Sequence, residues 1–361
     1  MTDIKFDILP QRSAVMADHN TEIFALVRAQ APSRPESEEN NRMPLNLSLV
    51  IDRSGSMSGK PLEEAKRCAA YIVDQLDSRD RVSLVVYDNR VDVLVPSTQV
   101  TDKAQLKHAI DRIRPGGTTN LYGGWEEGAK QCLIAAEGHC LSRVLLLSDG
   151  CANQGLTNRN EIAERCAEMI EAGVSTSTYG LGHYFNEELM VEMAKSGSGQ
   201  SYYGESAEDL LDPFQEEFSL MSALCARQVK LTLSAPASVQ FELLNDYRSL
   251  GDNTWQMPDL AYEGEAWALV KLTVPQDIPG DQLTGDLEVL RAFISYTDVA
   301  LDAPDTRSYT LRLPRVDANA WAAIAEEERV TGRMQEIRVA QLQSEVREAA
   351  LRRDWGLVDQ L

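Results

Sequence analysis

Short apolar runs alternate with helical patterns through the middle of the chain. Residues 45–52 (LNLSLVID) and 143–148 (RVLLLS) are apolar on both faces of an extended segment, whereas 61–76 and 159–172 carry a single apolar face, as amphipathic helices do. Strands that are apolar on both faces and separated by helices are typical of a mostly parallel sheet covered on both sides. The pattern therefore predicts an α/β domain over residues 45–226.

The rest of the chain has a β pattern on both sides of this domain. Residues 226–313 contain at least five segments that alternate with period two or are separated by Pro, Gly, Asn and Asp, as in an antiparallel sandwich. Two earlier segments, 4–8 and 22–29, also favour strands, and the α/β sheet does not need them. We therefore expect one antiparallel β-sandwich into which the α/β domain is inserted, with the polar loop 32–42 as the crossing point.

The last part of the chain changes to a helical, Ala/Glu/Arg-rich pattern. Apolar residues recur there at three–four spacing, at Val339, Leu342, Val346 and Ala349. This helix either packs on the sandwich or docks to a partner. The predicted organisation is N-terminal sandwich strands over 1–31, the α/β domain over 45–226, the remaining β-sandwich over 227–315 and a C-terminal helical segment over 316–361.

Charge and cysteine content narrow the class of protein. Among 361 residues, 56 are acidic and 35 are Lys or Arg, which gives a net charge of −21. A surface that negative repels phosphate backbones and anionic lipid, so we expect no nucleic-acid and no membrane partner. The first residues contain no apolar signal-peptide region, and the six cysteines form no CxxC pair. These features predict a cytoplasmic protein with reduced thiols.

Hard oxygen donors gather in three loops at predicted strand ends. Asp52, Ser54 and Ser56 lie in DRSGSM directly after 45–52, the loop 116–120 (GGTTN) adds threonine, and Asp149 follows the strand 143–148. The carboxyl ends of parallel strands meet at one edge of a sheet, where such sheets bind ligands. Two carboxylates balance the charge of a divalent cation, and carboxylate, hydroxyl and water oxygens suit Mg²⁺, with Mn²⁺ also accepted. We expect Asp52 to lie on the surface rim of this site.

These residues carry a resemblance to a known family. With Asp52, Ser54, Ser56, a threonine of GGTTN and Asp149, the chain resembles the von Willebrand factor type A (VWA) domain with a metal-ion-dependent adhesion site. The resemblance implies a doubly wound, mostly parallel six-stranded sheet. It also implies a metal held by the serines and the threonine, with the aspartates bound directly or through water. The flanking sandwich strands look like those of bacterial VWA proteins related to inter-alpha-trypsin inhibitor heavy chains.

Two positions depart from the family pattern. The threonine is doubled, and aligning the usual Thr-Asn pair favours Thr119 as the ligand, with Thr118 as the alternative. Arg53 places a cation inside the metal loop. Its side chain either points outward toward a partner's acidic group or pairs with a carboxylate on the rim of the site.

Catalytic interpretations fit the sequence poorly. SGSMSGKP (54–61) superficially resembles a phosphate-binding loop, but it has three residues between its glycines where four are required, and Pro61 replaces the magnesium-binding Ser or Thr. Asp52 and Asp149 would form a poor catalytic pair, because metal-bound carboxylates are poor proton shuttles. We predict no catalytic residues. Trp125 favours core packing, whereas Tyr184 and Phe185 could form a contact rim near the metal face.

Two functions of different classes remain. The first is a non-enzymatic scaffold or adaptor that grips a partner's Asp or Glu through the metal. The second is a regulatory subunit of an AAA+ ATPase remodelling complex, as in VWA proteins that resemble chelatase or MoxR-associated components.

Overall fold

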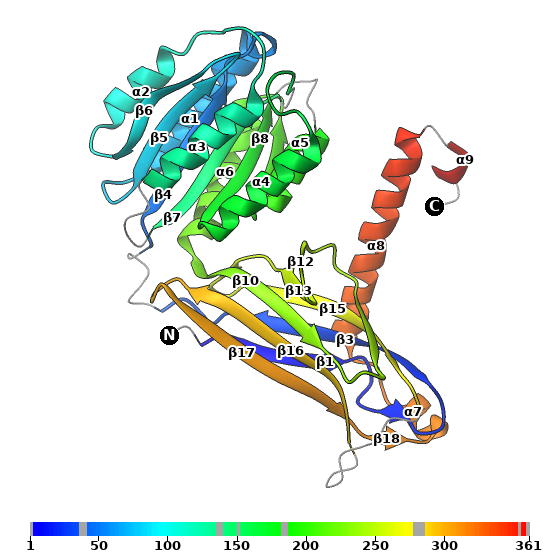
Figure 1. Ribbon diagram of the computed structural model, residues 1–361. Helices are drawn as coiled ribbons and strands as arrows, with labels where there is room; N and C mark the ends of the chain where they lie inside the picture. The colour runs from blue at the N-terminus through cyan, green and yellow to red at the C-terminus, as the bar shows by residue number, and fades with distance from the viewer. Residues whose placement is uncertain are drawn as a thin grey trace. The chain divides into compact units, whose positions relative to one another are not determined.

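The computed structural model describes residues 3–35, 42–134, 140–149, 152–181, 187–276, 286–352 and 355–358. The chain divides into two compact units (Figure 1). One unit is Arg34–Leu224, which we call the α/β unit, and the other joins Met1–Ser33 to Cys225–Leu361, which we call the sandwich unit. Along the sequence, the α/β unit is therefore an insertion in the sandwich unit.

The α/β unit is built on a six-stranded sheet in the order β6-β5-β4-β7-β8-β9. Neighbouring strands are parallel except for β5 and β6, which are antiparallel. The central strands β4 and β7 are buried along their whole length, which explains their continuous apolar runs. The strands are β4 (Leu45–Asp52), β5 (Arg81–Tyr87), β6 (Val91–Gln99), β7 (Leu141–Ser148), β8 (Val174–Leu181) and β9 (Ser201–Gly204).

Helices cover both faces of this sheet (Figure 1). On one face α1, α2 and α6 pack against strand residues such as Leu47 and Leu49, and on the other α3, α4 and α5 pack against Val50 and Leu146. This arrangement confirms the doubly wound α/β class. The helices are α1 (Lys60–Gln75), α2 (Lys103–Asp111), α3 (Leu121–Ile134), α4 (Arg159–Glu171), α5 (Glu187–Ser196) and α6 (Ala207–Ser222), and the 3-10 turn η2 (Gly55–Met57) precedes α1.

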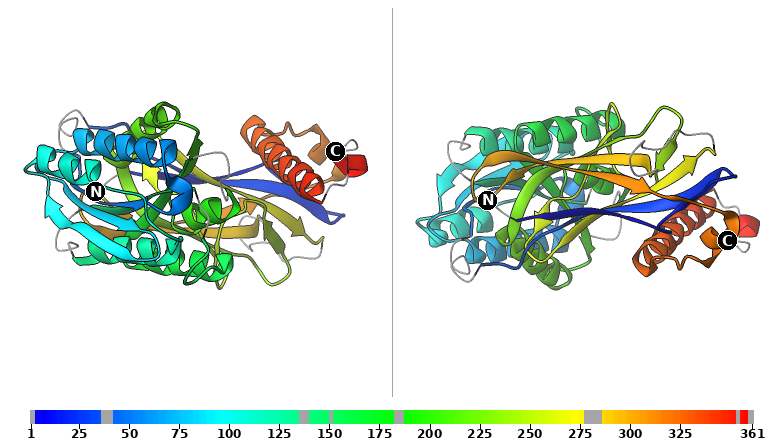
Figure 2. Two further views of the ribbon diagram at one scale, coloured as in Figure 1. Left: turned by 90° about the horizontal axis from the view of Figure 1, so that it is seen from above. Right: turned by 90° about the horizontal axis from the view of Figure 1, so that it is seen from below.

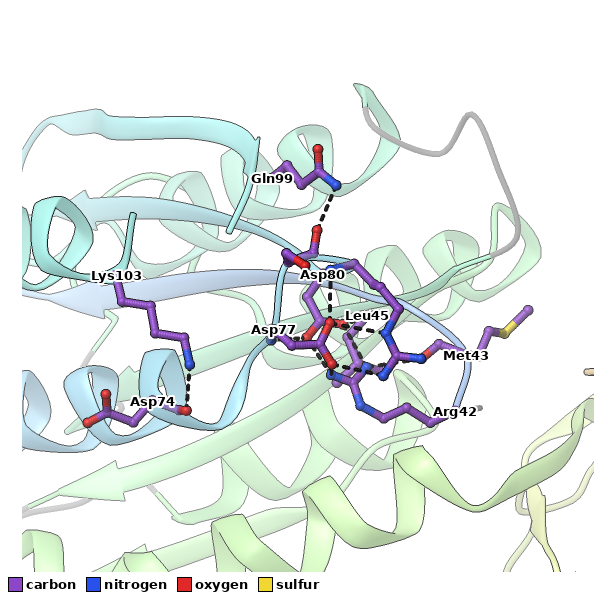
Figure 3. Close-up of polar contacts among 10 residues, drawn as sticks. Arg42, Met43, Leu45, Asp74, Asp77, Asp80, Gln99 and Lys103 are labelled. Carbon is purple, nitrogen blue, oxygen red and sulfur yellow. Dashed lines mark hydrogen bonds and ion pairs between the residues drawn. The ribbon is translucent and has the colours of Figure 1, made fainter. Parts of the chain in front are cut away.

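A buried carboxylate fixes the entry to β4 (Figure 3). Asp80, which is 0% exposed, accepts hydrogen bonds from the Arg42 guanidinium at 2.6 Å, from the Leu45 N–H at 2.9 Å and from the Asp77 N–H at 2.7 Å. These groups lie at the amino ends of β4 and β5. Because the two strands are parallel, this network and the carboxyl ends of the strands lie at opposite edges of the sheet.

The sandwich unit contains two antiparallel sheets that share one apolar core. Their orders are β1-β3-β15-β11 and β12-β13-β10-β16-β17, with β14 paired to β10. β3 pairs with β15 from Thr21↔Val274 to Gln30↔Glu265, so the N-terminal strands complete the sandwich as the sequence predicted.

A short parallel pair, β2 and β18, is separate from the two sheets. The strands of the sandwich unit are β1 (Lys5–Pro10), β2 (Val15–Met16), β3 (Thr21–Gln30), β10 (Leu224–Ser234), β11 (Gln240–Leu243), β12 (Ser249–Gly251), β13 (Thr254–Gln256), β14 (Leu260–Ala261), β15 (Glu265–Val274), β16 (Leu287–Asp298), β17 (Ala303–Leu313) and β18 (Arg315–Val316).

The chain passes from the α/β unit to the sandwich unit directly after α6. α6 ends at Ser222, and β10 already begins at Leu224. Cys225 and Ala226 are buried in the sandwich core, where they gain more as strand residues than as a last helical turn. The run Ala-Leu-Cys-Ala is apolar in either conformation, so the pattern alone does not locate this transition.

The C-terminal helix packs on the sandwich through its first half (Figure 2). Val330 of α8 is buried against Leu26 of β3, and the Arg333 guanidinium lies 4.4 Å from the ring centre of Trp267 on β15. Of the predicted apolar positions, Val339 is 53% exposed and Ala349 is 2% exposed, and the contacts with β3 and β15 come earlier along the helix than these positions. The C-terminal helices are α7 (Ala318–Ala323), α8 (Glu328–Leu351) and α9 (Trp355–Val358).

Two findings bear on the composition of the chain. None of the helices that the structure describes is long and apolar enough to cross a bilayer. Among the described cysteines, those at positions 68, 132, 140 and 166 are free thiols, and Cys151 lies outside the described residues.

Candidate metal centre

The first carboxylate of the site is held in place at the carboxyl end of β4. Asp52 Oδ1 accepts a hydrogen bond from the Ser54 N–H at 2.8 Å. Its Oδ2 accepts from the Ser148 hydroxyl at 2.7 Å and from the Tyr87 hydroxyl at 3.2 Å. Asp52 is 0% exposed, so the expectation that it lies on a surface rim is wrong: β5 and β7 flank it on both sides.

The second carboxylate lies close enough to act on the first. Burial raises the pKa of the Asp52 carboxyl to about 6; hydrogen bonds from Ser54 and Ser148 oppose this, and the negative charge of Asp149 adds to it. Asp149 follows β7 and is 7% exposed. Two neighbouring carboxylates in a poorly solvated site repel each other, and a cation between them would relieve that repulsion.

The hydroxyls of the first loop converge. The Ser54 and Ser56 oxygens lie 3.1 Å apart, because η2 curls the chain directly after β4. Ser54 is buried, whereas Ser56 is exposed. The pair therefore presents two oxygens beside the Asp52 carboxylate, one of them reachable from solvent.

The two threonines of the second loop differ in their surroundings. Thr118 is exposed and donates its hydroxyl to Gln154 Oε1 at 2.7 Å. Thr119 is 2% exposed, its N–H donates to Asn153 Oδ1 at 2.8 Å, and within the described part of the chain its hydroxyl makes no hydrogen bond. The Gly55 N–H donates to the Gly117 carbonyl at 2.8 Å, which ties this loop to the first one.

Arg53 is turned to the hairpin between β5 and β6. Its Nε donates to Asp88 Oδ2 at 3.2 Å, and its Nη2 lies 2.5 Å from Asp92 Oδ2. Of the two orientations that the sequence allowed, the ion pair with neighbouring carboxylates is therefore the one formed. These carboxylates are not the predicted metal ligands.

Sequence reasoning missed several supporting residues. Ser148 and Tyr87 hold Asp52, and Asn153 holds the backbone of Thr119. Tyr87 is the register partner of Asp52 across two parallel strands, a relationship that the sequence alone does not show. The Asn153 contact joins positions 34 residues apart and leaves no local pattern.

The aromatic residues singled out in the sequence do not share one location. Trp125 is a core residue: it is 0% exposed, and its indole N–H donates to the Thr176 hydroxyl at 3.0 Å. Tyr184 and Phe185, predicted as a contact rim, lie outside the described residues, as does Gly150 beside the site.

The donor set fits a hard divalent cation. Among the described residues there is no cluster of three or more His, Cys, Asp and Glu side chains that could hold a metal. The carboxylates and hydroxyl oxygens gathered at this edge could hold an ion, and they are Mg²⁺-type or Mn²⁺-type donors rather than the nitrogen and sulfur donors that zinc prefers.

Comparison with known proteins agrees with this fold. Residues 46–217 match the family model of the von Willebrand factor type A domain, so the α/β unit carries a VWA domain. The chain is 25% identical to the uncharacterized protein sll0103 of Synechocystis over 298 residues. This alignment covers 77% of this chain and 69% of that protein.

Two further comparisons show how much of the chain the resemblance covers. Inter-alpha-trypsin inhibitor heavy chain H3 of Mesocricetus auratus is 26% identical over 199 residues, which is 49% of this chain but only 22% of the heavy chain. The solved structure of a von Willebrand factor type A protein from Catenulispora acidiphila superposes with a TM-score of 0.72 at 16% identity, covering 96% of this chain and 82% of that one. The latter likeness extends the shared fold to both units.

Proposed function

We propose that this chain is a non-enzymatic module that binds a protein partner through a divalent cation, Mg²⁺ or Mn²⁺. Ser54, Ser56 and Thr119 would ligate the ion, with Asp52 and Asp149 bound directly or through water. The observation that carries the proposal is the proximity of two carboxylates, Asp52 and Asp149, beside convergent hydroxyls at one edge of a parallel sheet. The side chain of Arg53, the cation built into the loop, is paired elsewhere.

The donor set also explains how a partner would attach. When bound, the ion supplies positive charge and a coordination position that a carboxylate can fill. Ser56 is the exposed member of the set, so the solvent side of the site lies next to it. A partner's Asp or Glu side chain matches both the charge and the hardness of such a position.

We propose binding without turnover. Asp52 accepts hydrogen bonds from Ser54, Ser148 and Tyr87, which leaves it poorly placed to shuttle a proton. The ion would then act as an adhesive contact between two proteins. We further propose a cytoplasmic location, on the reduced-thiol interpretation of the cysteines. The charge of −21 favours partners other than nucleic acid and membrane.

The net negative charge of the chain also affects its affinity for an acidic partner. An acidic partner is repelled at long range, so recognition depends on the local cation, and association should slow as repulsion grows at low salt. A regulatory subunit of an AAA+ ATPase is the alternative against which the experiment must discriminate.

The experiment is capture from extract of the source cells by the immobilised full chain. Partners should be retained with Mg²⁺ and lost with EDTA or with Asp149→Ala, while Asp111→Asn, which removes an exposed charge from α2, changes nothing. Replacing the partner's key Asp or Glu by Asn or Gln should also abolish direct binding of the purified pair. Equal capture in EDTA or by Asp149→Ala contradicts the proposal. An AAA+ ATPase partner whose hydrolysis the chain stimulates would favour the alternative.

A further inference from the structure

Arg53 lies between two residues of the proposed site, Asp52 and Ser54. An arginine side chain there can reach the carboxylates that the ion needs. A guanidinium beside Asp52 or Asp149 would neutralise them and repel a divalent cation, because two like charges in a poorly solvated site interact strongly. Binding of the ion therefore requires that this side chain be kept away.

Two carboxylates on the β5–β6 hairpin hold Arg53. Its Nε donates to Asp88 Oδ2 at 3.2 Å, and its Nη2 lies 2.5 Å from Asp92 Oδ2. The Arg53 and Asp88 side chains are 19% and 8% exposed, so this contact is largely shielded from solvent, whereas Asp92 is 48% exposed. The guanidinium is thus paired with one buried carboxylate and one exposed carboxylate.

Asp88 is itself fixed among the loops of the site. Its Oδ1 accepts a hydrogen bond from the Arg90 N–H at 2.7 Å, and its carbonyl accepts from the Asn120 N–H at 2.9 Å. Gly116 packs directly on its carboxylate: a Cβ there would lie 1.8 Å from Asp88 Oδ2. The missing side chain at position 116 therefore makes room for the carboxylate that receives Arg53.

The backbone of Arg53 directs the side chain to the same place. Its N–H donates to the Tyr87 carbonyl at 2.9 Å, and its carbonyl accepts from the Gly116 N–H at 2.6 Å. Residue 53 is thereby held between the end of β5 and the glycine loop, next to Asp88.

We propose that Asp88 and Asp92 are positioning residues that hold the Arg53 guanidinium off the cation site and so determine its affinity for a divalent ion. This inference rests on the proposed function, since it concerns the same site. Without these two carboxylates, Arg53 can turn to Asp52 and Asp149 and compete with the ion.

Calorimetric titration of the full chain with Mg²⁺ tests this, using Asp88→Asn with Asp92→Asn. Asn keeps the size of the side chain and an acceptor for the Arg90 N–H, so the loops should stay folded. The double variant should bind Mg²⁺ about tenfold more weakly than the wild type. Adding Arg53→Gln to it should restore the affinity to within about a factor of two, because the competing charge is then gone.

The matched control is Asp111→Asn with Glu171→Gln, which removes two exposed charges from the last residues of α2 and α4 and should leave the affinity unchanged. Asp92→Asn alone, at an exposed position, gives a smaller loss of the same kind if the double variant is unstable. Wild-type affinity in the double variant, or no recovery with Arg53→Gln, overturns the inference while leaving the proposed function intact. If the wild type binds no Mg²⁺, both the inference and the proposed function are contradicted.

Discussion

Ser148 donates its hydroxyl hydrogen to Oδ2 of Asp52 across 2.7 Å and so joins the carboxyl ends of β7 and β4. Ser148 precedes Asp149, the second carboxylate of the site, by one residue. One dipeptide at the end of β7 therefore both supports the first carboxylate and supplies the second. This contact links the two strand ends on which the proposed ion site depends.

We predict that Ser148→Ala destabilises the α/β unit by about 1–3 kcal/mol, because a buried carboxylate loses one of its hydrogen-bond donors. It should also weaken Mg²⁺ binding, since Asp52 is then less firmly oriented. Urea unfolding of the full chain in EDTA measures the first effect. Ser58→Ala, at an exposed position just after η2, is the control and should stay within about 0.5 kcal/mol of the wild type. Equal unfolding of the two variants would contradict the prediction.

The buried carboxylate at the other edge of the sheet should matter for stability alone. Asp80→Asn removes the buried one of the two carboxylates that pair with Arg42, whose side chain is 11% exposed, and we expect a loss of about 3 kcal/mol. Asp74→Asn breaks an exposed pair with Lys107 on the same side of the unit and should cost at most about 1 kcal/mol. Both variants should keep the Mg²⁺ affinity of the wild type. A large affinity loss in Asp80→Asn would show that the two edges are coupled.

The two units should differ in whether they fold when expressed alone. Residues 34–224 contain a complete sheet with helices on both faces, so we expect this fragment to fold alone. Residues 225–361 lack β1 and β3, which leaves one edge of β15 unpaired, and unpaired edges promote aggregation. Expression of each fragment followed by thermal melting checks this. A soluble 225–361 fragment that melts cooperatively would disprove it.

The sequence pattern predicted the features of the fold that can be recognised from one strand at a time. β4 and β7 are apolar on both faces because helices cover both sides of them, and that pattern is visible without any structure. The expectation that the N-terminal strands join the sandwich followed from two strands that the α/β sheet could not use, whereas their pairing partners, such as β15 for β3, did not follow from the sequence. The boundary between α6 and β10 did not follow, since Cys225 and Ala226 are equally compatible with helix and strand.

The candidate site was predictable in its residue types and less so in its surroundings. Asp52, Ser54 and Ser56 stand in one short motif, so their convergence follows from local geometry. The burial of Asp52 depends on the strands on either side of it, and the pairing of Arg53 depends on Asp88, 35 residues away. Such contacts arise from the order of strands in the sheet, which no local spacing encodes.

The central claim is that a divalent ion binds at Asp52, Ser54, Ser56, Thr119 and Asp149, and calorimetric titration of the wild type and Ser56→Ala with Mg²⁺ tests it most directly. Ser56 is exposed, so its variant should fold like the wild type in EDTA. The account predicts one ion per wild-type chain, an affinity at least about tenfold lower in Ser56→Ala, and a stabilisation of about 2.7 kcal/mol at a hundredfold excess of Mg²⁺ over Kd. No binding by the wild type, with identical melting in EDTA and Mg²⁺, would contradict it.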